Sequence, residues 1–212
     1  MFISLGIEYD KDKFNAVKNR GIYEDTDFPP TKPIKGGLWG STYREEEQYV
    51  SEWERYIYEV LNPRLFSDKL SNISTLFKVC EGARVLEIRS FNDIWINLEN
   101  GTSNLALRQV KIGKNVPPQY KSHLFLDFER FAEYYDVIYV SQEFAKRVDW
   151  VLKEFERRVL AETEIYDEKL SISDLYISEL FEDWNVESIL IFNKEVINVK
   201  KYVRLNVAIQ SE

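Results

Sequence analysis

The sequence has very little of the chemistry that disulfides and transition-metal centres need. It contains one cysteine, Cys80, and one histidine, His123, among 212 residues. A single cysteine excludes an intrachain disulfide and is typical of a reducing compartment, so we expect a cytoplasmic protein. We also expect no metal site, because zinc centres draw on several Cys and His ligands. The 36 acidic residues leave carboxylate-only binding of a divalent cation open.

Motifs for nucleophilic catalysis and phosphate binding are also lacking. His123 lies in a loop rich in Pro and Lys, which disfavours a Ser-His-Asp triad. Cys80 belongs to an apolar run, so we predict a small buried core residue there. The segment "GGLWG" has neither the Lys-Ser/Thr ending nor the strand–loop–helix context of a nucleotide-binding glycine loop.

Long apolar runs and an excess of positive charge are absent too. No stretch approaches the roughly 18 apolar residues of a membrane span, and "MFISLGIEYDKDK" lacks the basic start of a signal peptide. We therefore expect no membrane association. The net charge is −8, from 28 basic and 36 acidic side chains, which disfavours broad binding to a nucleic-acid backbone.

The residues that are present predict one α+β domain over residues 1–212, with 44% apolar and 15% aromatic residues to build its core. Three- and four-residue spacing of apolar side chains predicts helices at 44–61, 127–135, 142–160 and 173–184, with a shorter one at 91–101. Strands are predicted at 2–8, 38–43, 136–141, 187–193 and 196–209, and 74–90 as a hairpin or two linked strands. The helical region 142–183 is expected to be an insertion packed on one side of the sheet.

Two segments are not explained by packing alone. In "KPIKGGLWGSTY", residues 32–43, Gly36 and Gly37 allow close backbone approach, Trp39 offers a flat apolar face, and hydroxyl residues follow. In "DWNVESILIFNKEVI", residues 183–197, Glu187 opens an apolar strand, where a carboxylate is well placed for a cleft. The alternatives are a core tryptophan after a turn and a strand-edge charge facing water.

Both segments resemble motifs of the ADP-ribosyltransferase superfamily. "ESILIFNKEVI" is similar to its last motif, in which a glutamate begins a strand that ends in Asn or Asp, and "KPIKGGLWGSTY" to its glycine-rich middle motif. The glycine of the family's first strand corresponds to Gly6. Small phage and bacterial proteins with a "KP-GGLW-S" segment, a Trp-containing helix (here Trp53), a "DYD"-like step (here Tyr135-Asp136) and a "W-x-V-E-S-I-L-x-F-N" ending also look similar. No counterpart is identified for residues 142–182.

The resemblance implies a split β-sheet core with flanking helices, and NAD as a substrate whose nicotinamide–ribose bond breaks through an oxocarbenium-like transition state. Glu187 would be the catalytic carboxylate, binding the ribose 2′-OH and stabilising the cation. The implied NAD contacts are stacking on Trp39 or Tyr43, the backbone near Gly6, close approach at Gly37, the pyrophosphate at Lys32 or Lys35, and Ser41 as a support for the glutamate.

Two departures from the family pattern leave a second hypothesis open. Leu5 stands where the family has His or Arg, which fits a degenerate, non-catalytic member, and Asn185 replaces a glutamate of arginine-modifying members, which disfavours arginine as the acceptor. The target, protein or nucleic acid, is not determined. The alternative is a phage-encoded, non-enzymatic binding protein that inhibits a host or defence component, favoured by the acidic balance, the aromatic surplus, the helical region and Leu5.

Overall fold

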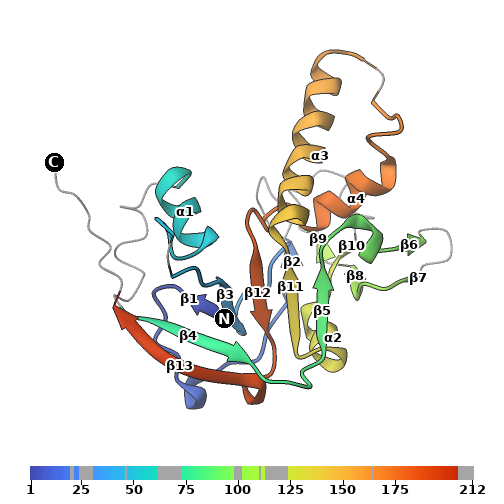
Figure 1. The fold of residues 1–212 in the computed structure, drawn as a ribbon. Helices are drawn as coiled ribbons and strands as arrows, with labels where there is room; N and C mark the ends of the chain where they lie inside the picture. The colour runs from blue at the N-terminus through green and yellow to red at the C-terminus, as the bar shows by residue number, and fades with distance from the viewer. Residues whose placement is uncertain are drawn as a thin grey trace.

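A seven-stranded, mostly antiparallel sheet forms the centre of the fold (Figure 1). The computed structural model describes residues 1–19, 22–23, 31–45, 47–61, 73–97, 102–109, 111–112, 124–163 and 165–204. The strand order is β13-β4-β1-β3-β12-β11-β5, and β11 and β5 pair in parallel. The strands are β1 (Phe2–Ser4), β3 (Leu38–Thr42), β4 (Ile73–Val79), β5 (Val85–Ile88), β11 (Val137–Val140), β12 (Ser188–Ile191) and β13 (Ile197–Arg204).

Helices and short strand pairs surround this sheet. The helices are α1 (Glu52–Glu59), α2 (Phe128–Tyr134), α3 (Gln142–Leu160) and α4 (Ile172–Leu180), with 3-10 turns η1 (Lys11–Lys13), η3 (Phe91–Asp93) and η5 (Lys194–Val196). The two-stranded pairs are β8 (Leu107–Gln109) with β10 (Leu124–Leu126), β2 (Ile22–Tyr23) with β9 (Lys111–Ile112), and β6 (Ile96–Asn97) with β7 (Thr102–Ser103). This arrangement confirms the α+β prediction.

Two apolar clusters lie on opposite faces of the sheet, because successive strand residues point to alternate sides. The first contains Ile138 and Leu190 together with side chains from α2, α3 and α4, and Trp184 is buried within it. The second contains Ile189 and Ile191 with side chains from β4 and the segment before β13. The region 142–183 therefore does pack on one side of the sheet, and Figure 1 shows α3 extending well past the sheet.

The helices start at capping residues, and α3 has the predicted bounds. The side chains of Ser51, Asp127, Ser141 and Ser171 each accept a hydrogen bond from a backbone N–H in the first turn of the helix that follows. The prediction for 44–61 is too long, because Glu54 accepts from the backbone N–H of Val50 and α1 begins only after Ser51. The helix at 173–184 is displaced, since Ser171 caps α4 and the helix ends at Leu180.

Other predictions are wrong because contacts distant in sequence decide the outcome. Of the two alternatives for 74–90, the two linked strands are confirmed and the hairpin is wrong: β4 lies between β1 and β13, whereas β5 pairs with β11. Cys80 is exposed in the connection between β4 and β5, not buried. The helix at 91–101 is limited to η3, because Asp93 accepts from the backbone N–H groups of Arg89 and Ser90 and the chain then enters β6.

Asp136, of the "DYD"-like step, ties three segments together before β11. Its buried carboxylate accepts hydrogen bonds from the backbone N–H and guanidinium of Arg84 and from the side-chain amide of Asn193. The hydrogen bonds from Arg84 hold the pKa of Asp136 well below its usual range. Asn193, which ends the strand motif named above, is thus held by Asp136. The contact between Asp136 and Arg84 holds the start of β5 beside β11.

Replacing Asp136 with Asn should destabilise the fold by about 2 kcal/mol at pH 7, toward the lower part of the range for a charged hydrogen bond, since Arg84 is half exposed. A lowered carboxyl pKa contributes stability above its unfolded value of about 3.9 and loses it as pH falls toward the folded pKa. Urea unfolding should therefore show the difference between wild type and Asp136→Asn shrinking below about pH 4.

The exposed Asp12→Asn is the matched control and should change the unfolding free energy by less than about 0.5 kcal/mol at every pH. If the unfolding free energies of wild type and Asp136→Asn differ by the same amount at every pH, the ionised Asp136 carboxylate does not stabilise the fold through Arg84.

Candidate functional site

Glu187 lies directly before β12, in the middle of the sheet, and is 4% exposed. β12 has β3 on one side and β11 on the other, so the first residues of this strand have sheet neighbours on both flanks. Glu187 therefore does open a buried strand as predicted. The alternative of a strand-edge charge facing water is wrong, because β12 is a central strand.

Polar groups from both neighbouring strands hold the Glu187 carboxylate. Its Oε1 accepts hydrogen bonds from Thr42 Oγ1, at 2.5 Å, and from the hydroxyl of Tyr139. Its Oε2 lies 3.7 Å from Nη2 of Arg44. The backbone N–H of Glu187 donates to Oε1 of Gln142, the first residue of α3, at 2.7 Å. Both the side chain and the main chain of Glu187 are thus fixed.

Arg44 extends this cluster to a second buried carboxylate on α1. Its Nη1 donates to Oε1 of Glu52 at 2.7 Å, and Glu52 is 7% exposed. Arg55 donates to the other oxygen of Glu52 at 2.8 and 2.6 Å. Burial opposes ionisation of Glu52, but the hydrogen bonds and charge of Arg55 and Arg44 outweigh it, and the pKa of Glu52 lies below its ordinary value. Charge pairing therefore fastens α1 to this end of the sheet.

Tyr139 is a neutral hydrogen-bond donor in this cluster. Burial, and then the hydrogen bond to Glu187, raise the pKa of Tyr139 well above its ordinary value. Its ring meets Phe2 edge to face, with centroids 6.2 Å apart. Because this contact holds the ring in place, the hydroxyl of Tyr139 is a preorganised donor to the Glu187 carboxylate.

Trp39 does not share a face with Glu187. It pairs with Leu190 across β3 and β12 and packs against Trp184, with ring centroids 5.0 Å apart, in the cluster that contains the helices. Glu187 lies on the other face, with Thr42 and Tyr139. The alternation of side chains along β3 separates the two residues that were expected to form one pocket.

Ser41 is separated from Glu187 for the same reason. It points away from the carboxylate, and among the described residues its buried hydroxyl has no hydrogen-bond partner. Thr42, one residue further on, supplies the hydroxyl instead. A hydroxyl of this segment does hold Glu187, but it belongs to Thr42. The prediction that Ser41 supports the glutamate is wrong.

The glycines are occupied by contacts within the protein. Gly37 has φ +70° and donates its N–H to the carbonyl of Asn15, and a Cβ there would lie 2.6 Å from Leu190 Cδ1. Gly6 donates its N–H to Ser74 Oγ at 3.0 Å, and it follows β1 at the end away from the Phe2–Thr42 pair. Neither backbone N–H is directed at the Glu187 cluster.

The remaining residues predicted to contact NAD are Tyr43, Lys35 and Lys32, and their surroundings differ. Tyr43 follows Thr42, and its N–H donates to the carbonyl of Met1. Lys35 is exposed, and its carbonyl accepts from the N–H of Lys18. Lys32 lies between two indole rings, with Nζ 5.6 Å from the centroid of Trp39 and 5.2 Å from that of Trp53. Burial lowers the pKa of Lys32, and the charge of Asp183 opposes this.

The sequence analysis missed Tyr139, Arg44, Glu52 and Gln142. One signal for Tyr139 was present, because it is the only residue of the apolar strand 137–140 with a polar group. Glu52 was hidden, since a glutamate on an amphipathic helix ordinarily faces water. Its burial depends on Arg44, which only the fold brings near.

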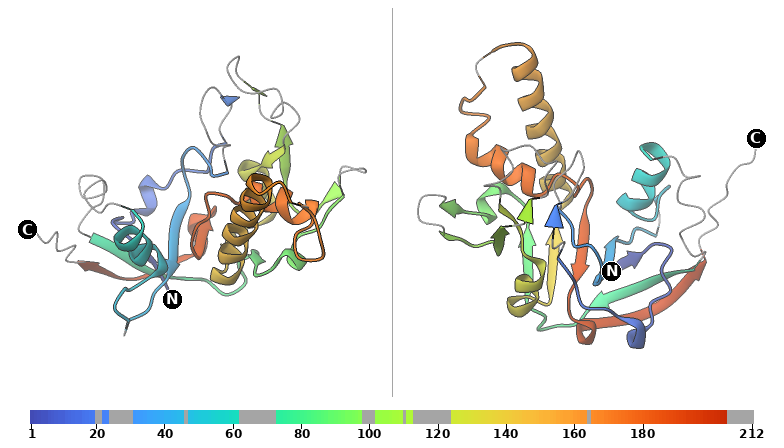
Figure 2. Two further views of the ribbon diagram at one scale, coloured as in Figure 1. Left: turned by 90° about the horizontal axis from the view of Figure 1, so that it is seen from above. Right: turned by 180° about the vertical axis from the view of Figure 1, so that it is seen from behind.

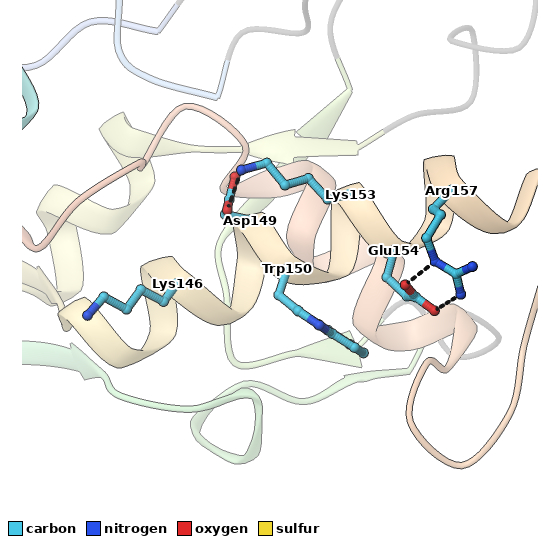
Figure 3. Close-up of a pocket in the computed structure, with 6 residues that line it drawn as sticks. All are labelled: Lys146, Asp149, Trp150, Lys153, Glu154 and Arg157. Atoms are coloured by element: carbon cyan, nitrogen blue, oxygen red, sulfur yellow. Dashed lines mark hydrogen bonds and ion pairs between the residues drawn. The ribbon is translucent and has the colours of Figure 1, made fainter. Parts of the chain in front are cut away.

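Two pockets lie along α3, and Glu187 lines neither of them. One, of about 400 Å³, is lined by Lys146, Asp149, Trp150, Lys153, Glu154 and Arg157. In Figure 3, Lys153 pairs with Asp149 and Arg157 with Glu154, so much of its charge is already compensated. The other, of about 190 Å³, lies between α3 and the segment before β12 and is lined by Ala145, Val148, Asp149, Leu152, Glu182, Trp184 and Asn185.

Among the described residues, no three His, Cys, Asp or Glu side chains are grouped so that they could hold a metal ion. None of the described helices is both long and apolar enough to cross a membrane. No family model, curated protein or solved structure matches the chain.

Replacing Arg44 with Met should destabilise the protein by about 2–3 kcal/mol at pH 7, because two buried carboxylates lose a cation. Glu52 has a lowered pKa, so the charge pairing contributes above the unfolded pKa of about 4.3 and is lost as pH falls through the folded value. Urea unfolding between pH 7 and pH 3 should show the loss diminish below about pH 4.

Lys153→Met breaks an exposed ion pair and is the control, with an expected change below about 0.5 kcal/mol. Equal losses in the two variants would show that the buried cluster contributes no more than a surface pair.

Proposed function

We propose that this protein is an ADP-ribosyltransferase-like enzyme that uses NAD as the donor and a macromolecule as the acceptor, with Glu187 as its catalytic carboxylate. The observation that carries the proposal is the buried Glu187 at the start of a central strand, held by Thr42 and Tyr139. A buried carboxylate is costly unless it is paired and hydrogen-bonded, as this one is. Such a group is what a developing positive charge requires nearby.

The chemistry follows from the position of this charge. When the nicotinamide–ribose bond of NAD breaks, positive charge develops on the ribose, and a fixed carboxylate in a water-poor site stabilises it. Glu187 would also accept a hydrogen bond from the ribose 2′-OH. The acceptor group of the macromolecule would then attack the ribose carbon as nicotinamide leaves. Arginine is the disfavoured acceptor, because Asn185 stands two residues before Glu187.

The shape of the sheet supports the same proposal. In Figure 1 and in the right view of Figure 2, β4 and β13 run obliquely across the lower part of the molecule, while β5, β11 and β12 stand upright. β1 and β3 connect these two parts. The strands form one continuous sheet, and we take its change of strand direction as support for the split core that the resemblance implies. Glu187 lies beside Thr42 of the connecting strand β3.

The proposal changes which aromatic residues would contact nicotinamide. Phe2 lies on the face of the sheet that carries Glu187, where its ring meets that of Tyr139, whereas Trp39 is held on the other face by Trp184. The ring of Phe2 is therefore the one that would flank a bound nicotinamide, while Tyr139 contacts the carboxylate.

The direct test is NAD binding by calorimetry together with transfer of label from NAD to lysate proteins and nucleic acids. Glu187→Gln should reduce transfer at least about 100-fold, because the negative charge at the reacting centre is lost. The exposed Glu133→Gln is the control and should retain wild-type transfer. Absence of NAD binding at millimolar concentration, with Glu187→Gln equal to wild type, would refute the proposal.

Trp39→Leu tests the assignment of faces. It should cost about 2–4 kcal/mol in urea unfolding, since a large side chain is removed from the packing against Trp184. The dissociation constant for NAD should stay within about twofold of wild type, because Trp39 lies away from Glu187. A selective loss of NAD affinity without loss of stability would return Trp39 to the nicotinamide site.

A second candidate function, a non-enzymatic binding protein, is favoured by exposed apolar side chains on the projecting α3–α4 region. Leu160 is 78% exposed and Ile172 is 67% exposed. Single exposed apolar residues are common, so the decisive evidence is a partner. Pull-down from a bacterial lysate should recover a stable partner that Leu160→Asp releases, and NAD turnover without any such partner would contradict this candidate.

A further inference from the structure

The two oxygens of the Glu187 carboxylate have different surroundings. Oε1 accepts hydrogen bonds from two hydroxyls, those of Thr42 and Tyr139. A carboxylate oxygen has two lone pairs, so these donors fill the acceptor capacity of Oε1. The donors belong to β3 and β11, the two strands that flank β12. The carboxylate is therefore held from both sides.

Oε2 keeps its acceptor capacity. Its nearest cation is Arg44, whose Nη2 is 3.7 Å away, which is too long for a hydrogen bond. Arg44 instead donates to Glu52, at 2.7 Å. In the described part of the chain Oε2 thus has a compensating charge nearby but accepts no hydrogen bond, which leaves it able to receive one from a ligand.

Tyr139 is one of the two donors that set this asymmetry. It lies on β11, in register opposite Ile189 of β12, and its ring packs edge to face against Phe2. Its hydroxyl donates to Glu187 across the regularly paired strands β11 and β12. Removal of that hydroxyl would free the carboxylate to rotate and would leave the packing of the ring in place.

We propose that Tyr139 is a positioning residue, which occupies Oε1 of Glu187 so that Oε2 is directed at the ribose hydroxyl of bound NAD. The role rests on the proposed function, and it names which oxygen of the catalytic carboxylate contacts the substrate. The 2′-OH of the ribose donates its proton in a hydrogen bond to Oε2. Tyr139 does not touch the substrate in this role, and no proton or bond is transferred to it.

Tyr139→Phe separates positioning from binding. The hydrolysis of NAD to ADP-ribose and nicotinamide should show kcat lowered about 10- to 100-fold with KM within about twofold, because misorientation of a fixed group affects the transition state. Tyr134→Phe, at an exposed tyrosine on α2, is the matched control and should behave as wild type.

The Thr42 pair gives a second, independent reading. Thr42→Val should lower kcat in the same way, and Thr42→Ser, which restores the hydroxyl, should recover most of it. If Tyr139→Phe fails to fold by circular dichroism, this pair decides the question: recovery by Ser supports an oriented Oε1, and equal loss in Val and Ser overturns it.

The remaining outcomes distinguish this inference from the proposed function. If the wild type hydrolyses NAD and Tyr139→Phe matches it in both kcat and KM, the positioning role is overturned and the proposed function stands. If Tyr139→Phe raises KM and leaves kcat unchanged, Tyr139 binds the ground state and the inference is also overturned. If the wild type neither binds nor hydrolyses NAD, the proposed function falls, and the role of Tyr139 falls with it.

Discussion

The register between β3 and β12 is the constraint on which the candidate site depends. It sets Thr42 beside Glu187 and Trp39 beside Leu190. Because side chains alternate along a strand, a shift of one residue would exchange the two faces and remove the carboxylate from its donors. The burial of Glu187 and the separation of Trp39 from it are two results of one pairing. The glycine-rich approach to β3 serves this pairing, since Gly37 allows Leu190 to pack closely.

Three buried carboxylates, Asp136, Glu52 and Glu187, show how the fold tolerates charge in its interior. Each is accompanied by an arginine, and the contacts differ in kind. Asp136 and Glu52 are hydrogen-bonded to their arginines, so their charge is used to join segments. Glu187 has its hydrogen bonds from neutral hydroxyls and its arginine further away. Glu187 thus joins no segments through a hydrogen-bonded ion pair, which distinguishes it from the other two carboxylates.

Local patterns in the sequence predicted what local forces determine. The spacing of apolar residues predicted the bounds of α3. The apolar run after Glu187 predicted that this glutamate lies at the start of a buried strand. Pairing over long distances was not accessible, so the sequence could not decide between a hairpin and two linked strands at 74–90, whereas the Arg84–Asp136 contact holds β5 beside β11. The partners of Glu187 were missed for the same reason, since Thr42 and Tyr139 are 145 and 48 residues away along the chain.

The hydrogen bond between Gln142 and the main chain of Glu187 joins the first residue of the longest helix to the candidate catalytic residue. At 19 residues, α3 is a rod of about 28 Å that is anchored at this end. The same helix packs through Phe144, Val148 and Val151 into the buried clusters beside it, so the main chain of Glu187 is tied to a fixed support and not to a free loop.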